Sequence, residues 1–372
     1  MLLPLSGPNG ELGDAMVNAA QLALFDFADD RFVLVFHDTH GTPEGAADAA
    51  ALAIGDGAAL ILGPLLATSV EAVAPAARAA GIAVVAYSSD RSIAGDGVFT
   101  MGFLPSAEIE RVVSYARSRG LLRFAALAPN DEYGFAVTAA LEGAVHDAGG
   151  ELDQVELYDP YGAEFSEPVR HIANYNSRRA ALLAQRSDLE GRDDEIARRA
   201  LARLENLQTI GDVSFDALIL ADGGKRLQAV AALLPFYDVD PAKVRVLGTG
   251  QWDVAGVGAE PALVGGWFAA PPREARAVFE RQYRDAYGAP PPRLATLAYD
   301  ATALAAVLAA SSAEPDLGVT ALTVSSGFAG RDGIFRFRAD GIAERGLAVI
   351  EVQRRGFKLI DPAPDAFGPA IN

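Results

Sequence analysis

The sequence contains no cysteine and only four histidines among its 372 residues. The lack of cysteine excludes disulfides, thiolate metal sites, cysteine nucleophiles and a lipid-modified cysteine on this chain. No uncharged apolar run reaches about 18 residues, so no transmembrane helix is expected. No basic segment precedes the first apolar run, so no signal peptide is expected either.

The composition is that of an acidic globular chain. Asp and Glu total 49 against 31 Lys and Arg, which gives a formal charge of −18. Such a surface repels phosphate backbones and anionic membrane faces, so neither nucleic acid nor such a membrane is an expected partner. At about 150 residues per domain, the length favours roughly two or three domains.

The signatures of common enzymes are missing as well. No GxGxxG follows the first apolar run, and GxxxxGK(S/T), GxSxG and HExxH do not occur. His37 and His40 flank Asp38 at an expected strand end, where they serve as hydrogen-bonding groups or, with a third ligand, hold a metal. Their expected positions on opposite faces favour hydrogen bonding. We therefore expect no enzyme, catalytic residue, metal site or cofactor.

Short apolar runs alternate with helical stretches in two successive series, an order that favours parallel sheets covered by helices on both faces. Thr42 is expected to cap the helix that begins at Pro43. The first series has expected strands at Met1–Leu5, Phe32–Phe36, Ala59–Leu62 and Ile82–Tyr87, and helices near Gly13–Ala28, Pro43–Ile54 and Ser69–Ala80. The second has expected strands at Phe124–Ala128, Val155–Tyr158, Ala217–Ala221 and Val244–Leu247, and helices at Val113–Arg119, Gly134–Ala148 and Arg226–Leu234.

A charged segment at about 170–210 interrupts the second series. Between Arg170 and Gln208 it carries eight arginines and six acidic residues. We expect a helical insertion packed on its lobe through one stripe, with a partner-docking surface as the alternative. The expected stripe consists of Ile196, Ala200, Leu204 and Leu207.

Small polar residues and glycines follow the expected strands at several points. Doubly wound sheets bind ligands at the carboxyl ends of their strands, so these residues are the candidate ligand site. One of Thr68 and Ser69 is expected to cap a helix, and the other to contact the ligand. Tyr133 offers a ring and a hydroxyl, and Trp252 an apolar surface. The candidates are Thr68, Ser69, Tyr87, Ser88, Ser89, Tyr133, Asp222, Gly223, Gln251 and Trp252.

These residues, in this order, resemble the type 1 periplasmic binding proteins, the superfamily of the leucine/isoleucine/valine receptor. The resemblance implies an α/β fold of two doubly wound lobes with parallel central sheets, hinge-linked by three crossovers. Lobe one would hold 1–104 and 270–343, and lobe two 105–269 and 344–372. The motifs that carry it are Leu3-Pro4-Leu5-Ser6-Gly7, Leu12-Gly13-Asp14, Gly63-Pro64 with Thr68-Ser69, Gly81-Ile82 with Ser88-Ser89, and Asp131-Glu132-Tyr133-Gly134.

The chain departs from the amino-acid receptors of that superfamily at two candidate positions. Ala67 stands where those receptors use a serine, although its backbone N–H still serves as a ligand contact. No acid for a ligand ammonium stands near Gly250-Gln251. Without that charge-assisted bond the site is expected to favour another small polar ligand.

A narrower resemblance is to proteins known as penicillin-binding-protein activators. It implies a non-enzymatic periplasmic protein that closes on a small polar molecule, regulates peptidoglycan synthesis and contacts a peptidoglycan synthase. Its leader and any lipid-anchored N-terminal part would be absent from this chain. The alternative is the substrate-binding component of an ABC importer for branched-chain or other amino acids, with an ABC permease as partner. The motifs are Leu247-Gly248-Thr249-Gly250-Gln251-Trp252-Asp253, Glu260-Pro261-Ala262-Leu263-Val264-Gly265-Gly266-Trp267, Pro291-Pro292-Arg293-Leu294-Ala295 and Leu297-Ala298-Tyr299-Asp300.

Overall fold

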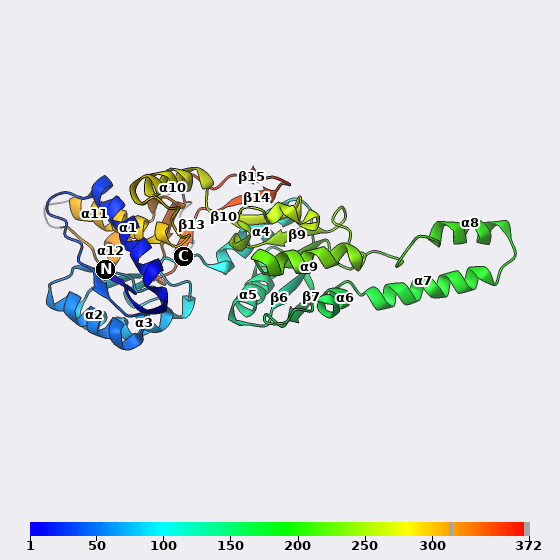
Figure 1. Ribbon diagram of the computed structural model, residues 1–372, viewed down its shortest axis with the longest axis horizontal. Coiled ribbons are helices and arrows are strands. Elements are labelled where there is room, and N and C mark those ends of the chain that lie inside the picture. Colours follow the sequence, from blue (N-terminus) through cyan, green and yellow to red (C-terminus); the bar gives the residue numbers. More distant parts are fainter. Residues whose placement is uncertain (312–314, 368–372) are drawn as a thin grey trace. The chain divides into compact units, whose positions relative to one another are not determined.

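The computed structural model of the chain describes residues 1–311 and 315–367, which form two compact units (Figure 1). Unit 1 comprises Met1–Leu104, Pro271–Leu347 and, within the described range, 363–367. Unit 2 comprises Pro105–Ala270 and Ala348–Pro362.

The unit boundaries differ from the expected lobes chiefly at the C-terminal end. Residues 344–347 and 363–367, which we expected in lobe two, belong to unit 1. There the guanidinium carbon of Arg336 lies 4.7 Å from the centroid of the Phe367 ring. The chain therefore passes between the units four times, once more than the three expected crossovers.

Unit 1 contains short parallel strands from the first βα series. Strand β1 (Leu2–Leu3) pairs with β2 (His37–Asp38), and β3 (Leu60–Leu62), β4 (Ala83–Ala86) and β5 (Val98–Thr100) pair in that order. The backbones of β1 and β3 approach closely, because a Cβ added at Gly63 would lie 2.2 Å from the Leu2 oxygen. The expected strand over Phe32–Phe36 is wrong in its position, since the ladder begins only at His37.

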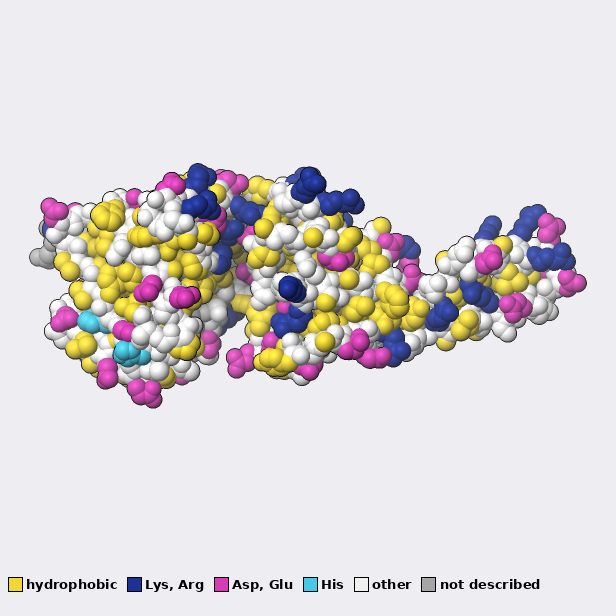
Figure 2. All heavy atoms as spheres, viewed as in Figure 1, with side chains coloured by type: hydrophobic (Ala, Val, Ile, Leu, Met, Phe, Trp, Pro, Cys, Tyr) yellow, Lys and Arg dark blue, Asp and Glu magenta, His cyan; other side chains and the backbone are white. Residues whose placement is uncertain are grey.

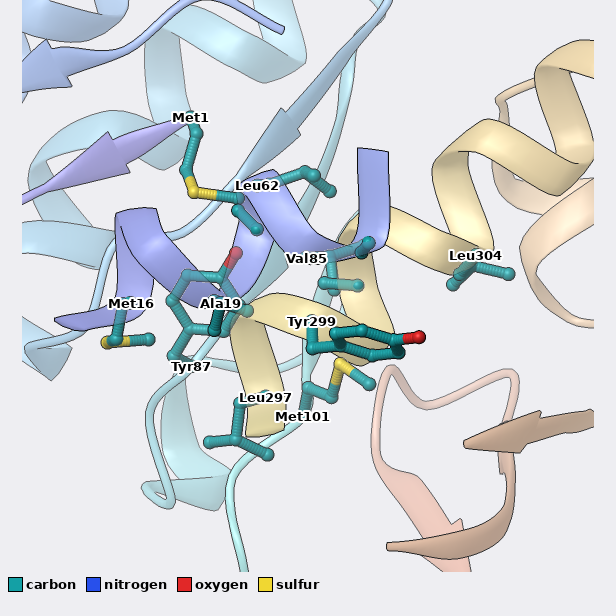
Figure 3. Packing of buried hydrophobic residues seen from close by; sticks show 14 of the residues in the cluster. Met1, Met16, Ala19, Leu62, Val85, Tyr87, Met101, Leu297, Tyr299 and Leu304 are labelled. Carbon is teal, nitrogen blue, oxygen red and sulfur yellow. The ribbon is translucent and has the colours of Figure 1, made fainter. Parts of the chain in front are cut away.

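Helices pack on both sides of these strands and enclose two apolar clusters. One cluster packs α1 and α11 against the strands and includes Met16, Val85, Tyr87 and Leu297 (Figure 3). The other packs α2 and α3. As expected, Thr42 caps α2 by accepting the Gly45 N–H at 3.1 Å. The helices of unit 1 are α1 (Gly10–Phe27), α2 (Pro43–Gly55), α3 (Ala67–Ala80), α10 (Arg273–Tyr287), α11 (Ala295–Ala310) and α12 (Val319–Leu322).

Unit 1 also contains a small antiparallel sheet, and short 3-10 helices occur in both units. The sheet consists of β11 (Phe328–Gly330), β12 (Gly333–Phe337) and β13 (Ala343–Arg345). The 3-10 helices are η1 (Gly7–Asn9), η2 (Arg91–Ile93), η3 (Gly250–Trp252), η4 (Val257–Ala259) and η5 (Pro261–Leu263).

Unit 2 is built on a seven-stranded sheet with the strand order β15-β14-β10-β9-β8-β6-β7. The five strands β7, β6, β8, β9 and β10 are parallel to one another. Strand β14 pairs antiparallel with β10, and β15 pairs antiparallel with β14. Strands β6, β8, β9 and β10 have buried, apolar centres, because helices cover the sheet, whereas the edge strand β7 is largely polar and partly exposed. The strands are β6 (Arg123–Pro129), β7 (Glu151–Tyr158), β8 (Ala217–Leu220), β9 (Arg245–Gly248), β10 (Trp267–Ala270), β14 (Ala348–Val352) and β15 (Phe357–Asp361); the helices of the series are α4 (Pro105–Ser118), α5 (Glu132–Asp147) and α9 (Gly224–Phe236).

The charged insertion is helical, as expected, and forms α6 (Ser166–Ile172), α7 (Tyr175–Glu190) and α8 (Glu195–Leu204). Helices α7 and α8 lie side by side (Figure 1), and basic and acidic side chains mix along their surface (Figure 2).

The expected apolar stripe of the insertion is wrong at Ile196, which is 75% exposed. Asp194 caps α8 by accepting the Ala197 N–H at 2.8 Å. The stripe is also wrong at Leu207, which is 42% exposed, whereas the expected Leu204 is buried, together with Ala197 and with Leu182 of α7. The insertion therefore packs through a narrower stripe than the apolar spacing predicted.

Candidate functional site

The candidate site of unit 1 begins where β3 ends and α3 starts. The N-cap of α3 is Leu66, and its side chain makes no cap hydrogen bond. The expectation that Thr68 or Ser69 caps this helix is therefore wrong, because both lie within its first turn, after Ala67. Ser69 is buried and its Oγ donates to the Thr42 carbonyl at 3.4 Å, whereas Thr68 is exposed. Of these two side chains, only that of Thr68 is therefore exposed to solvent at this edge.

The segment after β4 lies next to the start of α3, because the Tyr87 N–H donates to the Pro64 carbonyl at 2.9 Å. Ser88 is buried, and its Oγ accepts the Asp90 N–H at 3.1 Å. Ser89 is exposed. The polar groups offered here are thus small hydroxyls and backbone N–H groups.

Tyr87 does not offer its hydroxyl at this edge, contrary to our expectation. The side chain is 2% exposed and belongs to the core cluster of unit 1 (Figure 3). Among the described residues its hydroxyl has no hydrogen-bond partner. Burial alone raises the pKa of Tyr87 far above its ordinary value, so the hydroxyl stays protonated.

The candidate site of unit 2 is centred on Tyr133, in the first turn of α5. Asp131 caps this helix by accepting the Gly134 N–H at 2.9 Å. The Tyr133 hydroxyl lies 2.7 Å from the Oγ1 of Thr249, the residue that directly follows β9. Burial raises the pKa of Tyr133, the Thr249 bond opposes that shift, and the nearby Glu108 carboxylate adds to it. Tyr133 is therefore a neutral hydrogen-bonding group fixed beside the Gly250-Gln251 segment.

Asp222 is buried within a hydrogen-bonded network at the end of β8. It accepts the Tyr158 hydroxyl at 2.5 Å and the Gly223 N–H at 2.7 Å, and forms an ion pair with Arg226. Its backbone carbonyl accepts the Trp252 Nε1–H at 3.1 Å. Asp222 thus joins β7, β8, α9 and η3, and its carboxylate is committed to these internal partners.

Trp252 is fully buried, so the expectation that its ring offers an apolar surface to a ligand is wrong. The ring packs against Gly248, where an added Cβ would lie 2.1 Å from the indole. Gln251, the preceding residue, is exposed. Its Oε1 would lie 2.9 Å from a Cβ added at Gly223, so these two expected residues are neighbours.

Glu108 is a site residue that the sequence analysis missed. It lies on α4, is 9% exposed, and its Oε2 accepts the Gly250 N–H at 2.8 Å. Its Oε1 would lie 2.4 Å from a Cβ added at Gly250, so the carboxylate lies directly against this glycine. The structure therefore places an acid at the segment where we expected none. No local motif marks it, because the two residues are 142 positions apart in sequence.

Among the described residues, no group of three or more His, Asp or Glu side chains is arranged to hold a metal ion. His40 contacts the Ser6 Oγ at 2.7 Å and the Asp38 carboxylate at 3.0 Å, in agreement with a hydrogen-bonding role. No helix in the described part of the chain combines the length and apolarity needed to cross a membrane.

Comparison with known families identifies the class to which this fold and these strand-end residues belong. A family model described as "Periplasmic binding protein" matches residues 1–357. The chain therefore belongs to the periplasmic binding protein family, and its fold is that of the type 1 members.

Solved structures from several bacteria share this fold at low sequence identity. A putative branched-chain amino acid ABC transporter protein from Rhodospirillum rubrum has a TM-score of 0.75 at 18% identity, covering 96% of this chain and 98% of that one. An ABC transporter substrate-binding protein from Sphaerobacter thermophilus has a TM-score of 0.70 at 19% identity, with coverage of 98% and 96%. The substrate binding protein LivJ from Streptococcus pneumoniae, in complex with isoleucine, has a TM-score of 0.59 at 17% identity, with coverage of 97% and 98%.

One curated relative is an uncharacterized protein of Rickettsia prowazekii. It is 23% identical over 189 residues. The match spans 50% of this chain and 49% of the relative, so about half of each protein is aligned.

Proposed function

We propose that the chain is a non-enzymatic periplasmic ligand-binding protein that holds a small polar molecule at the carboxyl ends of its parallel strands. The closing of two lobes on that molecule, as the resemblance implies, is part of the proposal. The observation that carries it is the fixed cluster of Tyr133, Thr249 and Glu108 around Gly250. These groups are held by one another and by the backbone, as a preformed recognition site requires.

The two edges offer recognition groups of different chemical character, each considered by itself. In unit 1 the start of α3 and the exposed hydroxyls of Thr68 and Ser89 favour an anionic or hydrogen-bond-accepting group. In unit 2 the Glu108 carboxylate favours a group that donates hydrogen bonds. Glu108 thus supplies an acid beside Gly250-Gln251, where the sequence itself has none. The site therefore restricts the ligand less than we expected from the sequence.

For the physiological role we propose a regulator of peptidoglycan synthesis like the penicillin-binding-protein activators, with a peptidoglycan synthase as partner. Its support is the set of motifs from Leu247 to Asp300 and the helical insertion. The alternative is the substrate-binding component of an ABC importer for amino acids, working with a permease. The similar solved structures, which include ABC transporter proteins, favour this alternative.

A thermal-shift screen of amino acids, small carboxylates and muropeptides tests ligand binding directly. A ligand at a hundred times its Kd should stabilise the protein by about 2.7 kcal/mol. Glu108→Gln should reduce that shift, whereas Glu142→Gln, on the exposed face of α5, should not. No shift with any solute would contradict ligand binding.

Co-purification with peptidoglycan synthases and with ABC permeases distinguishes the two roles. Capture of a synthase that persists without added solute supports the regulator. A large solute-induced shift together with permease binding supports the importer. Binding to neither class of partner would contradict both roles.

A further inference from the structure

Helix α8 of the insertion has apolar side chains on two sides, and α7 covers only one of them. Ala197 and Leu204 are buried, as is Leu182 of the adjacent α7 (Figure 1). Ile196 is 75% exposed. A single exposed apolar side chain is ordinary on a protein surface, so the inference below depends on the charges that surround it.

The face of α8 that carries Ile196 includes the residues three, four and seven positions later, because these positions are neighbours on a helix surface. They are Arg199, Ala200 and Arg203, and we name the four residues the α8 outer face. Both arginines are exposed, and Ala200 is partly exposed. Ala200 has the smallest side chain of the four, so it is the position where a large side chain of a partner can pack.

Charges of opposite sign are separated along α8. Acids occupy positions 193–195, directly before Ile196, and arginines occupy positions 198, 199 and 203 after it. Two of these arginines are paired within the chain, Arg198 with Asp193 at 2.9 Å and Arg199 with Glu195. Among the described residues, none holds the Arg203 guanidinium by a hydrogen bond or an ion pair. A surface that covers the α8 outer face should therefore supply a carboxylate for Arg203.

We propose that the α8 outer face binds the same face of a second copy of this chain, with the two α8 helices antiparallel about a two-fold axis. A two-fold contact is self-complementary, because every pair of residues occurs twice. With Ile196 packed on Ala200 of the second copy, Arg203 comes level with Asp193 of that copy. The reason is that Arg203 lies three positions after Ala200, and Asp193 three positions before Ile196. The Asp193 side chain is 99% exposed, so its carboxylate remains accessible beside Arg198.

The helix pair that carries this face is held in place by hydrogen bonds within the chain. Arg178, in the first turn of α7, donates to the Gly211 carbonyl at 2.8 Å and to the Asp238 carbonyl at 3.3 Å. Arg186 donates to the Glu205 carbonyl, just after α8, at 2.9 Å. Because the helices are already ordered, association loses little conformational entropy.

The size of the contact determines its strength. Helix α8 has 10 residues and is therefore about 15 Å long. Two helices of this length bury less surface than stable dimers do, which is about 1,200–2,000 Å². We therefore expect a reversible dimer that forms at high protein concentration. Salt should weaken it, because its ion pairs are exposed.

Analytical ultracentrifugation of the whole chain, from about 10 µM to about 1 mM, tests the association. At low salt the mean mass should rise towards twice that of the chain over this range, and in about 0.5 M NaCl it should rise less. A chain that stays monomeric at every concentration would overturn the proposal.

Two lysine substitutions test whether the contact lies on the α8 outer face. Ile196→Lys should abolish the rise in mass and leave Tm unchanged, because the side chain is exposed. Ala184→Lys adds the same charge at an exposed position of α7 and should preserve the rise. A dimer that survives Ile196→Lys, or that Ala184→Lys abolishes as well, would contradict the proposed contact.

An exchange of charges tests the antiparallel register. Arg203→Asp alone should weaken association at least tenfold, because it places two carboxylates against each other. The double variant Arg203→Asp with Asp193→Arg should restore association, since each carboxylate then meets a guanidinium again. Failure of the double variant to restore the dimer would contradict the register.

Other occupants of the α8 outer face are distinguished in the same series. A monomeric wild type that binds phosphatidylglycerol vesicles or a peptidoglycan synthase, and loses that binding in Ile196→Lys, would assign the face to that partner and overturn self-association. The substitutions lie outside the cluster of Tyr133, Thr249 and Glu108. Solute-induced thermal shifts therefore test the proposed function independently.

Discussion

At the carboxyl-end edge of unit 1, Thr68 in the first turn of α3 and Ser89 after β4 have exposed side chains. At the corresponding edge of unit 2, Tyr133, Glu108 and Asp222 are held in a network that reaches the core. Recognition groups that are loosely held can be altered without loss of stability. Groups that also pack the domain cannot, so we expect folding and the proposed ligand binding to be coupled in unit 2 and separable in unit 1.

The strongest test of this difference is Trp252→Ala. Removal of a fully buried indole should lower the free energy of unfolding by about 3–5 kcal/mol. Urea denaturation of the variant measures this loss. Phe236→Ala, at a side chain that is 70% exposed, is the control and should stay within about 0.5 kcal/mol of wild type. A stable Trp252→Ala protein would place the ring outside the core after all.

Asp222→Ala should cost about 2–3 kcal/mol, because it leaves the Tyr158 hydroxyl and the Arg226 guanidinium without their shared acceptor. The double variant Asp222→Ala with Arg226→Ala should lose much less than the sum of the two single changes. Additive losses in the denaturation cycle would show that the network does not act as a unit.

A buried acid of unit 1 should make the free energy of unfolding depend on pH. Burial, together with the adjacent Asp332 carboxylate, raises the pKa of Asp300 to about 7. Between the ordinary value of 3.8 and about 7, the folded state therefore binds more protons, and the free energy of unfolding falls as pH rises.

Asp300→Asn should weaken this fall by at least about 1 kcal/mol between pH 4 and pH 7, as chemical denaturation across that range would measure. The Met1 amino group has the opposite dependence, because its pKa is lowered from 8.0 to about 6. The Met1 amino group is present in wild type and in Asp300→Asn alike, so its titration does not affect the difference between their pH profiles. Parallel pH profiles for wild type and variant would refute the titration of Asp300.

Tyr133→Phe should reduce stability by about 1 kcal/mol, since it removes the hydrogen bond to Thr249. It should also weaken the binding of any solute found in the thermal-shift screen, as isothermal calorimetry would show. Tyr161→Phe, at a ring that is 94% exposed, is the matched control. Unchanged solute affinity in Tyr133→Phe would remove its hydroxyl from the proposed site.

Thr68→Ala and Ser89→Ala should have the smallest effect on folding, within about 0.5 kcal/mol, because both side chains are exposed. The same changes should nevertheless lower solute affinity in calorimetry. Substantial destabilisation by either change would break the contrast between the two edges, since unit 1 would then also couple binding to packing.

The site could be predicted from sequence only where local patterns position a residue. Asp131 caps α5 and thereby places Tyr133 at a strand end, as the turn motif indicated. Trp252 follows a strand in the same way, yet the missing side chain at Gly248 lets its ring turn inward. Tyr87 also follows a strand and is buried, in the core cluster that includes residues of α1 and α11. Proximity to a strand end did not determine the direction of these side chains.

The amino-acid order by itself determined the α/β class, the two βα series and the helical insertion, because hydrophobic periodicity and helix caps act over a few neighbouring residues. Only the tertiary structure decided that Glu108 meets Gly250, that Trp252 is internal and that Ile196 is exposed. Those outcomes depend on close packing between segments far apart in the chain, where a single absent Cβ admits or excludes a neighbour.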